Sequence, residues 1–185
     1  RLEANGAGAQ IHADHTIGGF GTNVYGGTSY TQANQISGND GDGFQALAAN
    51  GGLIRGNLLG NDISGNTGNG AALLVDKGGE IDFGTPGSNR VIRGNKLNNN
   101  GAAGLLTNQL SVPGSLSTIK ADVLGNEISG NGGGGIVSRL YGVNNTPPVP
   151  PVLIDNNRLD LVVGGTAAAD ANTISGNTDV GIEVY

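Results

Sequence analysis

The stretch that decides the fold is Asn126-Glu127-Ile128-Ser129-Gly130-Asn131-Gly132-Gly133-Gly134-Gly135-Ile136, because variants of it recur along the chain. The tetrad Ile-Ser-Gly-Asn occurs four times, and a wider unit occurs five times. The wider unit is Asn-x-(Ile/Leu), followed by a Gly-apolar pair whose apolar residue lies eight positions after the Ile or Leu. Its Ile or Leu stands at positions 36, 63, 97, 128 and 174, at intervals of 27, 34, 31 and 46 residues. Such internal similarity indicates a repeat protein.

The composition excludes most other fold classes. Of the 185 residues, 36 are glycine and 23 are asparagine, two types that disfavour helix interiors and tolerate left-handed backbone. This composition argues against helical and α/β domains. Collagen is excluded because glycine does not recur at every third position and there are only 6 prolines. The recurrent Ile, Leu and Val positions, within a hydrophobic content of 36%, argue against a disordered chain.

Charge and cysteine content narrow the setting. The formal net charge is −6 with only 9 basic residues, so we expect no nucleic-acid partner. There is no cysteine, which excludes disulfides and thiolate metal sites. No apolar run approaches the ~18 residues that span a bilayer, so we expect no membrane span.

Short apolar patches between Gly- and Asn-rich corners predict an all-β solenoid. The patches are two to four residues long, too short for helices, and the corner residues supply positive φ angles. Strands joined by such corners, at roughly 20–30 residues per turn, form the coils of a parallel β-solenoid. We predict one domain over residues 1–185 with about six to eight coils. The alternative, a β-sandwich, predicts strands of about 5–6 residues and hairpin turns instead of one repeated corner.

The alignment of the repeats predicts two stacked rows of residues. Equivalent residues on neighbouring coils lie about 4.8 Å apart, so corner asparagines can form a ladder of side-chain amides. The predicted ladder consists of Asn34, Asn61, Asn95, Asn126 and Asn172. The residues directly after Asn61, Asn95 and Asn126 are Asp62, Lys96 and Glu127. They are predicted to stack as a charge row of alternating sign. Exposed pairs contribute about 0.2–1 kcal/mol, so we expect this row to fix register more than it stabilises.

The repeats resemble those of a known superfamily. Residues 26–39 and 164–177 share the string Gly-Gly-Thr-x5-Asn-x-Ile-Ser-Gly-Asn. Together with the Gly-Ile that follows, it resembles the right-handed parallel β-helix repeats of pectin-lyase-like proteins, and especially repeat regions of large secreted or cell-surface bacterial proteins. The resemblance covers residues 2–185 and implies a single-stranded right-handed parallel β-helix at an extracellular or cell-surface location. The superfamily includes lyases, hydrolases and adhesins, so the resemblance does not determine the function.

Acidic residues supply the candidate sites for chemistry. Asp40 and Asp42 form a candidate Ca²⁺ site, because carboxylates are hard oxygen ligands; we expect no other cofactor. Two further acidic groups are most simply solvated loop charges: Asp76, Glu80 and Asp82 beside Lys77, and Asp155 and Asp160 beside Arg158. A polysaccharide lyase or hydrolase of this architecture needs at least two carboxylates and a basic residue converging on one exposed sheet, in a groove walled by long loops.

Residues 143–152 interrupt the repeats with a proline-rich segment. Four prolines in five residues favour a stiff, extended loop. Loops on a rigid scaffold often carry recognition, which makes Arg139, Tyr141, Pro147 and Pro148 candidate ligand or partner contacts. The alternative is a rigid spacer between coils.

Neither end of the chain has an amphipathic helix that could cap a solenoid, so we expect both ends to be uncapped. Unpaired strand edges and apolar core invite contact with protein partners or with other copies of the chain. The sequence therefore favours a non-enzymatic, rigid extracellular or cell-surface module for structure, adhesion or subunit contact. The alternative is a β-helix that binds or cleaves polysaccharide.

Overall fold

Three parallel β-sheets form the fold of this chain. The computed structural model describes residues 2–3, 8–13, 23–26, 34–84, 90–110, 115–141 and 157–185. Sheet A contains β1 (Leu2–Glu3), β4 (Gln35–Ser37), β7 (Asp62–Ser64), β11 (Lys96–Asn98), β14 (Glu127–Ser129) and β17 (Thr173–Ser175). Sheet B contains β2 (Ala9–Ala13), β5 (Phe44–Ala48), β8 (Ala71–Asp76), β12 (Leu105–Leu110), β15 (Ile136–Tyr141) and β18 (Ile182–Val184). Sheet C contains β3 (Asn23–Gly26), β6 (Leu53–Leu59), β9 (Glu80–Phe83), β10 (Ile92–Arg93), β13 (Thr118–Leu124) and β16 (Arg158–Val163).

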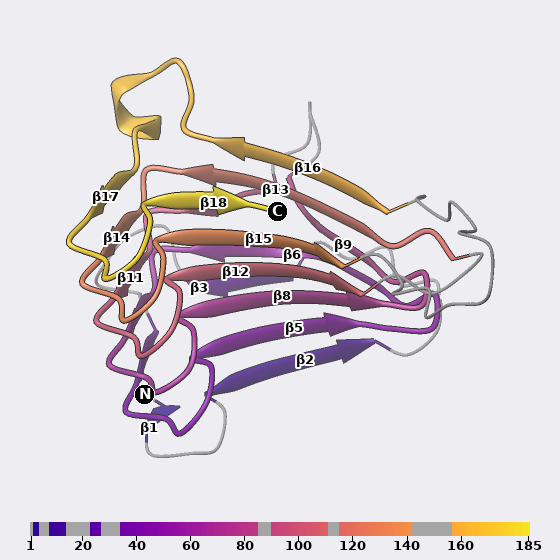
Figure 1. Ribbon diagram of the computed structural model, residues 1–185, viewed down its shortest axis with the longest axis horizontal. Helices are drawn as coiled ribbons and strands as arrows, with labels where there is room; N and C mark the ends of the chain where they lie inside the picture. The colour runs from indigo at the N-terminus through magenta and orange to yellow at the C-terminus, as the bar shows by residue number, and fades with distance from the viewer. Residues whose placement is uncertain are drawn as a thin grey trace, which may run out of the picture.

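The chain visits sheets A, B and C in turn, so each coil adds one level to every sheet (Figure 1). The predicted all-β parallel solenoid is confirmed. The described strands make five complete coils and the first two strands of a sixth, fewer than the six to eight expected. The difference arises because three of the four intervals between equivalent asparagines, 31, 34 and 46 residues, exceed the roughly 20–30 residues expected for one turn.

Alternation along each short strand builds the core. One residue of each sheet A strand from β4 to β14 points inward, and these residues stack through Ile36, Ile63, Leu97 and Ile128. Sheets B and C contribute further aliphatic layers, as the low aromatic content requires. Phe44 and Phe83 add an edge-on aromatic pair with ring centroids 6.3 Å apart. Burial of this continuous aliphatic column is the main favourable term in folding.

The glycine of the Ile-Ser-Gly-Asn tetrad makes the corner between sheets A and B. Its φ angle lies between 61° and 67° in all four tetrads, in the left-handed region that glycine adopts most readily. In the fourth-coil repeat, Asn99 replaces this glycine and adopts a φ of 55°. Asparagine is one of the few other residues that tolerate this conformation.

Candidate functional site

The predicted Asn ladder is present at the corner that precedes sheet A. Each side chain donates through Nδ2 to Oδ1 of the asparagine on the next coil, at 3.0 to 3.1 Å. The rung in the fourth coil, Asn95, also donates to the carbonyl oxygen of Leu58 at 2.8 Å. Each buried rung thus satisfies its own amide and that of its neighbour, as buried polar groups require.

A second Asn ladder, which we did not predict from the sequence, runs along the corner after sheet A. It consists of the last residue of each tetrad and its equivalent in the fourth coil: Asn39, Asn66, Asn100, Asn131 and Asn177. The Nδ2 to Oδ1 distances are 2.7 to 3.1 Å. The sequence signal for this second ladder is the asparagine at the fourth position of the tetrad, which recurs at the same intervals as the asparagines of the first ladder.

The charge row has the predicted register. Lys96 lies opposite Asp62 on one side and opposite Glu127 on the other. The two carboxylates also accept local hydrogen bonds, Asp62 from the Ser64 hydroxyl at 2.7 Å and Glu127 from Nδ2 of Asn98 at 2.8 Å. The strand register thus sets three charges of alternating sign opposite one another on three successive coils of sheet A.

Asp42 has a structural partner on the next coil. Its Oδ1 accepts hydrogen bonds from the backbone N–H and Nδ2 of Asn69, both at 2.8 Å, and its Oδ2 accepts one from Gln45 at 3.2 Å. Asp40 is exposed. In the described ranges, no three His, Asp or Glu side chains lie close enough together to hold a metal ion. The hydrogen bonds of Asp42 thus connect two neighbouring coils.

The candidate partner contacts lie partly outside the described residues. Arg139 is on β15, and its guanidinium carbon lies 5.6 Å from the ring centroid of Tyr185. Tyr141 is the last residue of β15, but its side chain, Pro147, Pro148 and the whole segment 143–152 lie outside the described part. Asp155 is also outside it.

The outer face of sheet C gathers charged side chains from four coils. Arg55, Asp82, Lys120 and Asp160 are opposite one another in the strand register, so their charges alternate along the sheet. They alternate along their strands with core residues, which places them on the outer face. Beside this row, Lys120 donates to Glu80 at 2.9 Å. The string Asn157-Arg158-Leu159 follows the Asn-x-(Ile/Leu) pattern of the sheet A repeats. Arg158 nevertheless pairs with Thr118 in sheet C and takes no part in the charge row of sheet A.

Asp82 and Asp122 lie near enough on this face for the charge of one carboxylate to act on the other. The Asp82 side chain is only 2% exposed, and it accepts from Arg90 at 2.6 Å and from the Gly84 N–H at 3.2 Å. Burial, together with the negative charge of Asp82, raises the pKa of Asp122 above its usual value. The sequence indicated Asp82, but not Asp122 or Arg90, because their proximity depends on which strands stack across long intervening segments.

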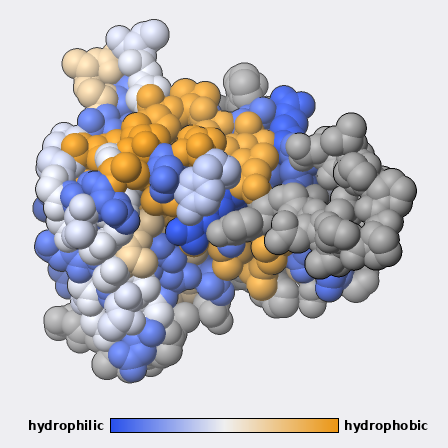
Figure 2. Space-filling model, viewed as in Figure 1, coloured by the Kyte–Doolittle hydropathy of each residue, from blue (hydrophilic) through white to orange (hydrophobic). Residues whose placement is uncertain are grey.

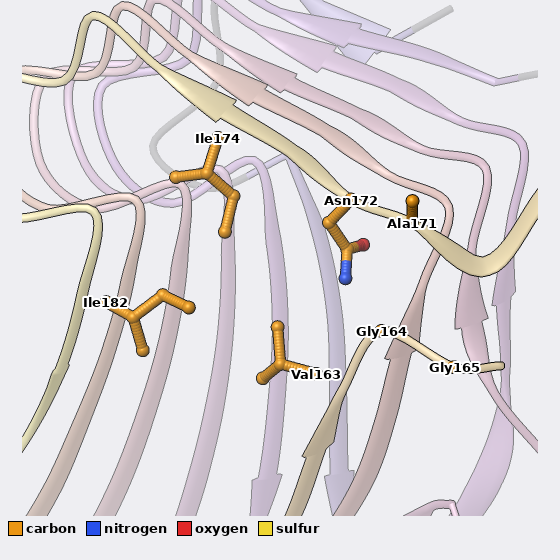
Figure 3. A pocket seen from close by; sticks show the side chains of 7 residues that line it. All are labelled: Val163, Gly164, Gly165, Ala171, Asn172, Ile174 and Ile182. Carbon is orange, nitrogen blue, oxygen red and sulfur yellow. The ribbon is translucent and has the colours of Figure 1, made fainter. Parts of the chain in front are cut away.

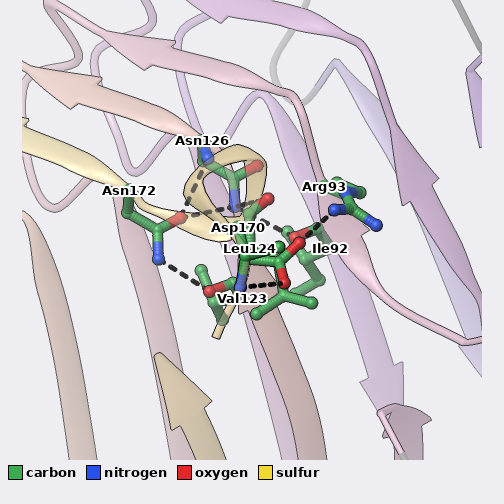
Figure 4. Close-up of polar contacts among 8 residues, drawn as sticks. Ile92, Arg93, Val123, Leu124, Asn126, Asp170 and Asn172 are labelled. Atoms are coloured by element: carbon green, nitrogen blue, oxygen red, sulfur yellow. Dashed lines mark hydrogen bonds and ion pairs between the residues drawn. The ribbon is translucent and has the colours of Figure 1, made fainter. Parts of the chain in front are cut away.

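An open hollow of about 510 Å³ lies at the C-terminal end of the solenoid. It is lined by Val163 of β16, Ile174 of β17 and Ile182 of β18, with Gly164 and Asn172 beside them (Figure 3). The segment that borders it contains a 3-10 turn, Ala168–Asp170. Figure 4 shows one anchor of this turn, in which the Asp170 carboxylate accepts from Arg93 of β10. The backbone carbonyl oxygen of Asp170 also accepts from the Gly125 N–H at 2.9 Å.

Searches against protein-family models, curated proteins and solved structures found no match to this chain. The described part of the chain also has no helix with the length and apolar character needed to cross a bilayer. We therefore infer the function from the geometry of the ladders, sheet C and the C-terminal hollow.

Proposed function

We propose that this chain is a rigid, non-catalytic module, located outside the cell or on its surface, that contributes structure, adhesion or subunit contact. The observation that carries the proposal is the pair of continuous Asn ladders along both corners of sheet A. A buried side-chain amide that is hydrogen-bonded to both neighbouring coils resists their separation. Moving either coil away would leave buried polar groups without hydrogen-bond partners. The coils thus form one stiff body.

The C-terminal coil supports the contact part of the proposal. Ile182 is 50% exposed and Val184 is 60% exposed, and Val180 and Tyr185 are also exposed. In Figure 2, hydrophobic residues form a continuous area over the upper part of the molecule, where Figure 1 places β18. Contiguous exposed apolar surface of this kind marks interaction sites in soluble proteins. Strand edges beside it add unpaired backbone groups.

The extracellular or cell-surface location rests on the resemblance of the Gly-Gly-Thr and Ile-Ser-Gly-Asn strings to pectin-lyase-like repeats. The chain also has no cysteine, which is compatible with a secreted bacterial surface protein.

Small-angle scattering over a concentration series tests the proposal. End-to-end association through the open coil lengthens the particle along the coil axis without thickening it. A monomer at every concentration would contradict subunit contact between copies.

A second candidate function is polysaccharide binding or cleavage on sheet C, favoured by the Asp82–Asp122 pair with Arg90 beside it. In glycoside hydrolysis one carboxyl group of a pair is kept protonated as the acid, and the raised pKa of Asp122 fits that role. The burial of Asp82 and its ion pair with Arg90 weigh against the candidate, since both carboxyl groups must reach the substrate.

A depolymerisation assay on acidic and neutral polysaccharides tests this second candidate. Cleavage by the native chain that is lost in Asp122→Asn, and kept in the matched surface variant Asp179→Asn, would establish it. Equal products with and without the protein would exclude cleavage of the polysaccharides tested.

A further inference from the structure

The chain contains five Asn-Gly dipeptides, which begin at Asn5, Asn50, Asn69, Asn100 and Asn131. All but the first lie within the described residues, in unlike environments. An asparagine followed by glycine is chemically labile, because glycine has no Cβ to keep its backbone nitrogen away from the asparagine side chain. The local structure therefore decides which of these dipeptides reacts.

Two of the dipeptides belong to the second Asn ladder and are held from several sides. The buried Asn100 side chain donates to Asn131 and to a backbone carbonyl oxygen, both at 3.1 Å, and its Oδ1 accepts twice from Asn66. Asn131 repeats this arrangement one coil further on. The glycine N–H groups donate to the preceding coil, at 2.7 Å from Gly101 and 2.8 Å from Gly132. A reaction within either dipeptide would break several buried hydrogen bonds.

Asn69 is half-buried and is tied to both neighbouring coils. Its Nδ2 donates to Asp42 at 2.8 Å, and its Oδ1 accepts from the Ala103 N–H at 3.0 Å. The Gly70 N–H donates to the carbonyl oxygen of Ala103 at 2.9 Å. The Asn69 amide is thus fixed in the same manner as a ladder residue.

Asn50 differs because it is exposed, in a two-residue turn between β5 and β6. Asn50 and Gly51 have φ angles of 50° and 79°, and the Gly52 N–H closes the turn on the Ala49 carbonyl oxygen at 2.7 Å. Positive φ at both positions is the type I′ turn that Asn-Gly favours. The Gly51 N–H donates to the Lys77 carbonyl oxygen at 3.1 Å. An exposed corner of this kind opens locally while the core stays folded.

We propose that Asn50 is a site of spontaneous covalent modification, at which the folded chain converts a side-chain amide to a carboxylate. The Gly51 nitrogen attacks Cγ of Asn50, the Cγ–Nδ2 bond breaks, and ammonia leaves with the proton of the Gly51 amide. One water molecule then opens the resulting succinimide ring to aspartate or isoaspartate. The product adds one negative charge, which changes the formal net charge from −6 to −7.

The new carboxylate lies beside a cation. Lys77 and Gly78 form the equivalent turn on the next coil, with φ angles of 48° and 81°. Lys77 therefore occupies the position of Asn50 one coil further on, about 4.8 Å away along the solenoid. Its exposed ammonium group is within reach of the product carboxylate, so the modification adds a charge where an opposite charge is already present.

Incubation of the full chain in mildly alkaline buffer, followed by peptide mapping with mass spectrometry, measures the conversion at each dipeptide. We expect Asn50 to react about thirtyfold or more faster than the other three described sites, because each of those must first lose several hydrogen bonds. The same incubation in urea removes the fold, and the four rates should then become similar.

Two variants create a further Asn-Gly dipeptide in each kind of environment. Lys77→Asn creates one in the equivalent exposed turn, and we expect position 77 to react at a rate similar to that of Asn50. Thr67→Gly creates one in the second ladder, after the buried Asn66, and this dipeptide should stay intact. Thermal unfolding checks that both variants fold.

Conversion of Asn50 in the folded chain no faster than that of Asn100 and Asn131 would overturn the proposal. Conversion of Asn50 in urea alone would also overturn it, since the fold would then protect the turn as well. A reactive ladder site in Thr67→Gly, together with an inert turn in Lys77→Asn, would show that exposure does not select the site and would reject the proposal.

Discussion

Asn61 donates two hydrogen bonds to a single atom of Asn95, from its backbone N–H at 2.9 Å and from its Nδ2 at 3.0 Å. The two residues are 34 positions apart in sequence and one coil apart in space. The same double donation links Asn95 to Asn126 and Asn126 to Asn172. Side-chain and backbone amides thus fasten each coil to the next at one corner.

Replacing Asn95 with alanine tests the ladder. The change leaves the Asn61 donors and the Leu58 carbonyl without their partner in a buried site. We expect a loss of about 3 kcal/mol in the free energy of unfolding, measured by urea denaturation, because each buried unsatisfied group costs about 1–3 kcal/mol. The matched variant Asn34→Ala removes the exposed asparagine at the N-terminal end of the same ladder. It should lower the free energy of unfolding by about 1 kcal/mol or less. Equal losses in the two variants would show that burial of the ladder is unimportant.

Replacing Gly104 with alanine tests the close approach of neighbouring coils. A Cβ at this position would lie 2.4 Å from Cγ2 of Ile128 and 2.9 Å from Nδ2 of Asn131. We expect a loss of about 2–3 kcal/mol, since overpacking forces core and ladder to shift.

The control for this substitution is Gly94→Ala. Gly94 has a φ of 66°, and no atom lies within 4 Å of the position that a Cβ would take. Its replacement therefore adds backbone strain alone, about 1 kcal/mol. A smaller loss for Gly104→Ala than for Gly94→Ala would contradict the account of coil packing.

The repeats allowed the architecture and the first ladder to be predicted because one corner recurs with constant internal spacing. Ile36, Ile63, Leu97 and Ile128 occupy equivalent core positions on successive coils. Coil number was harder to predict, since the segments between sheets B and C and within sheet C vary in length. The second ladder was missed although its asparagines belong to the same tetrad.

The charged face of sheet C could not be derived from the sequence in the same way. Asp82 pairs in register with Arg55 and Lys120, but no repeated motif marks any of the three. Their proximity follows from the pairing of β6, β9 and β13, which depends on the lengths of the intervening segments. For the same reason, Arg158 is in sheet C although its local string resembles the sheet A repeat.

The stability of the protein should depend on pH through Asp122. Burial and the charge of Asp82 raise its folded-state pKa above the ordinary value of 3.8. Folding therefore disfavours the ionised carboxylate, and stability decreases as the pH rises from 3.8 through the folded pKa. Asp122→Asn removes this decrease, so the stability of the variant relative to the native chain should rise over that interval. We expect a gain below about 1 kcal/mol, because the site is partly screened by solvent. Urea denaturation from pH 3 to 7 measures it, and a constant or falling difference would contradict the assignment.

The central claim, a rigid module that makes contacts through its open C-terminal coil, is tested most directly by light scattering of three chains over a concentration series. The chains are the native protein, the double variant Ile182→Lys/Val184→Lys, and the control Leu116→Lys, whose leucine is 55% exposed but lies before β13. We predict that the native chain and the control associate as concentration rises, while the double variant remains monomeric. A native chain that stays monomeric throughout, or association that persists unchanged in the double variant, would contradict the claim.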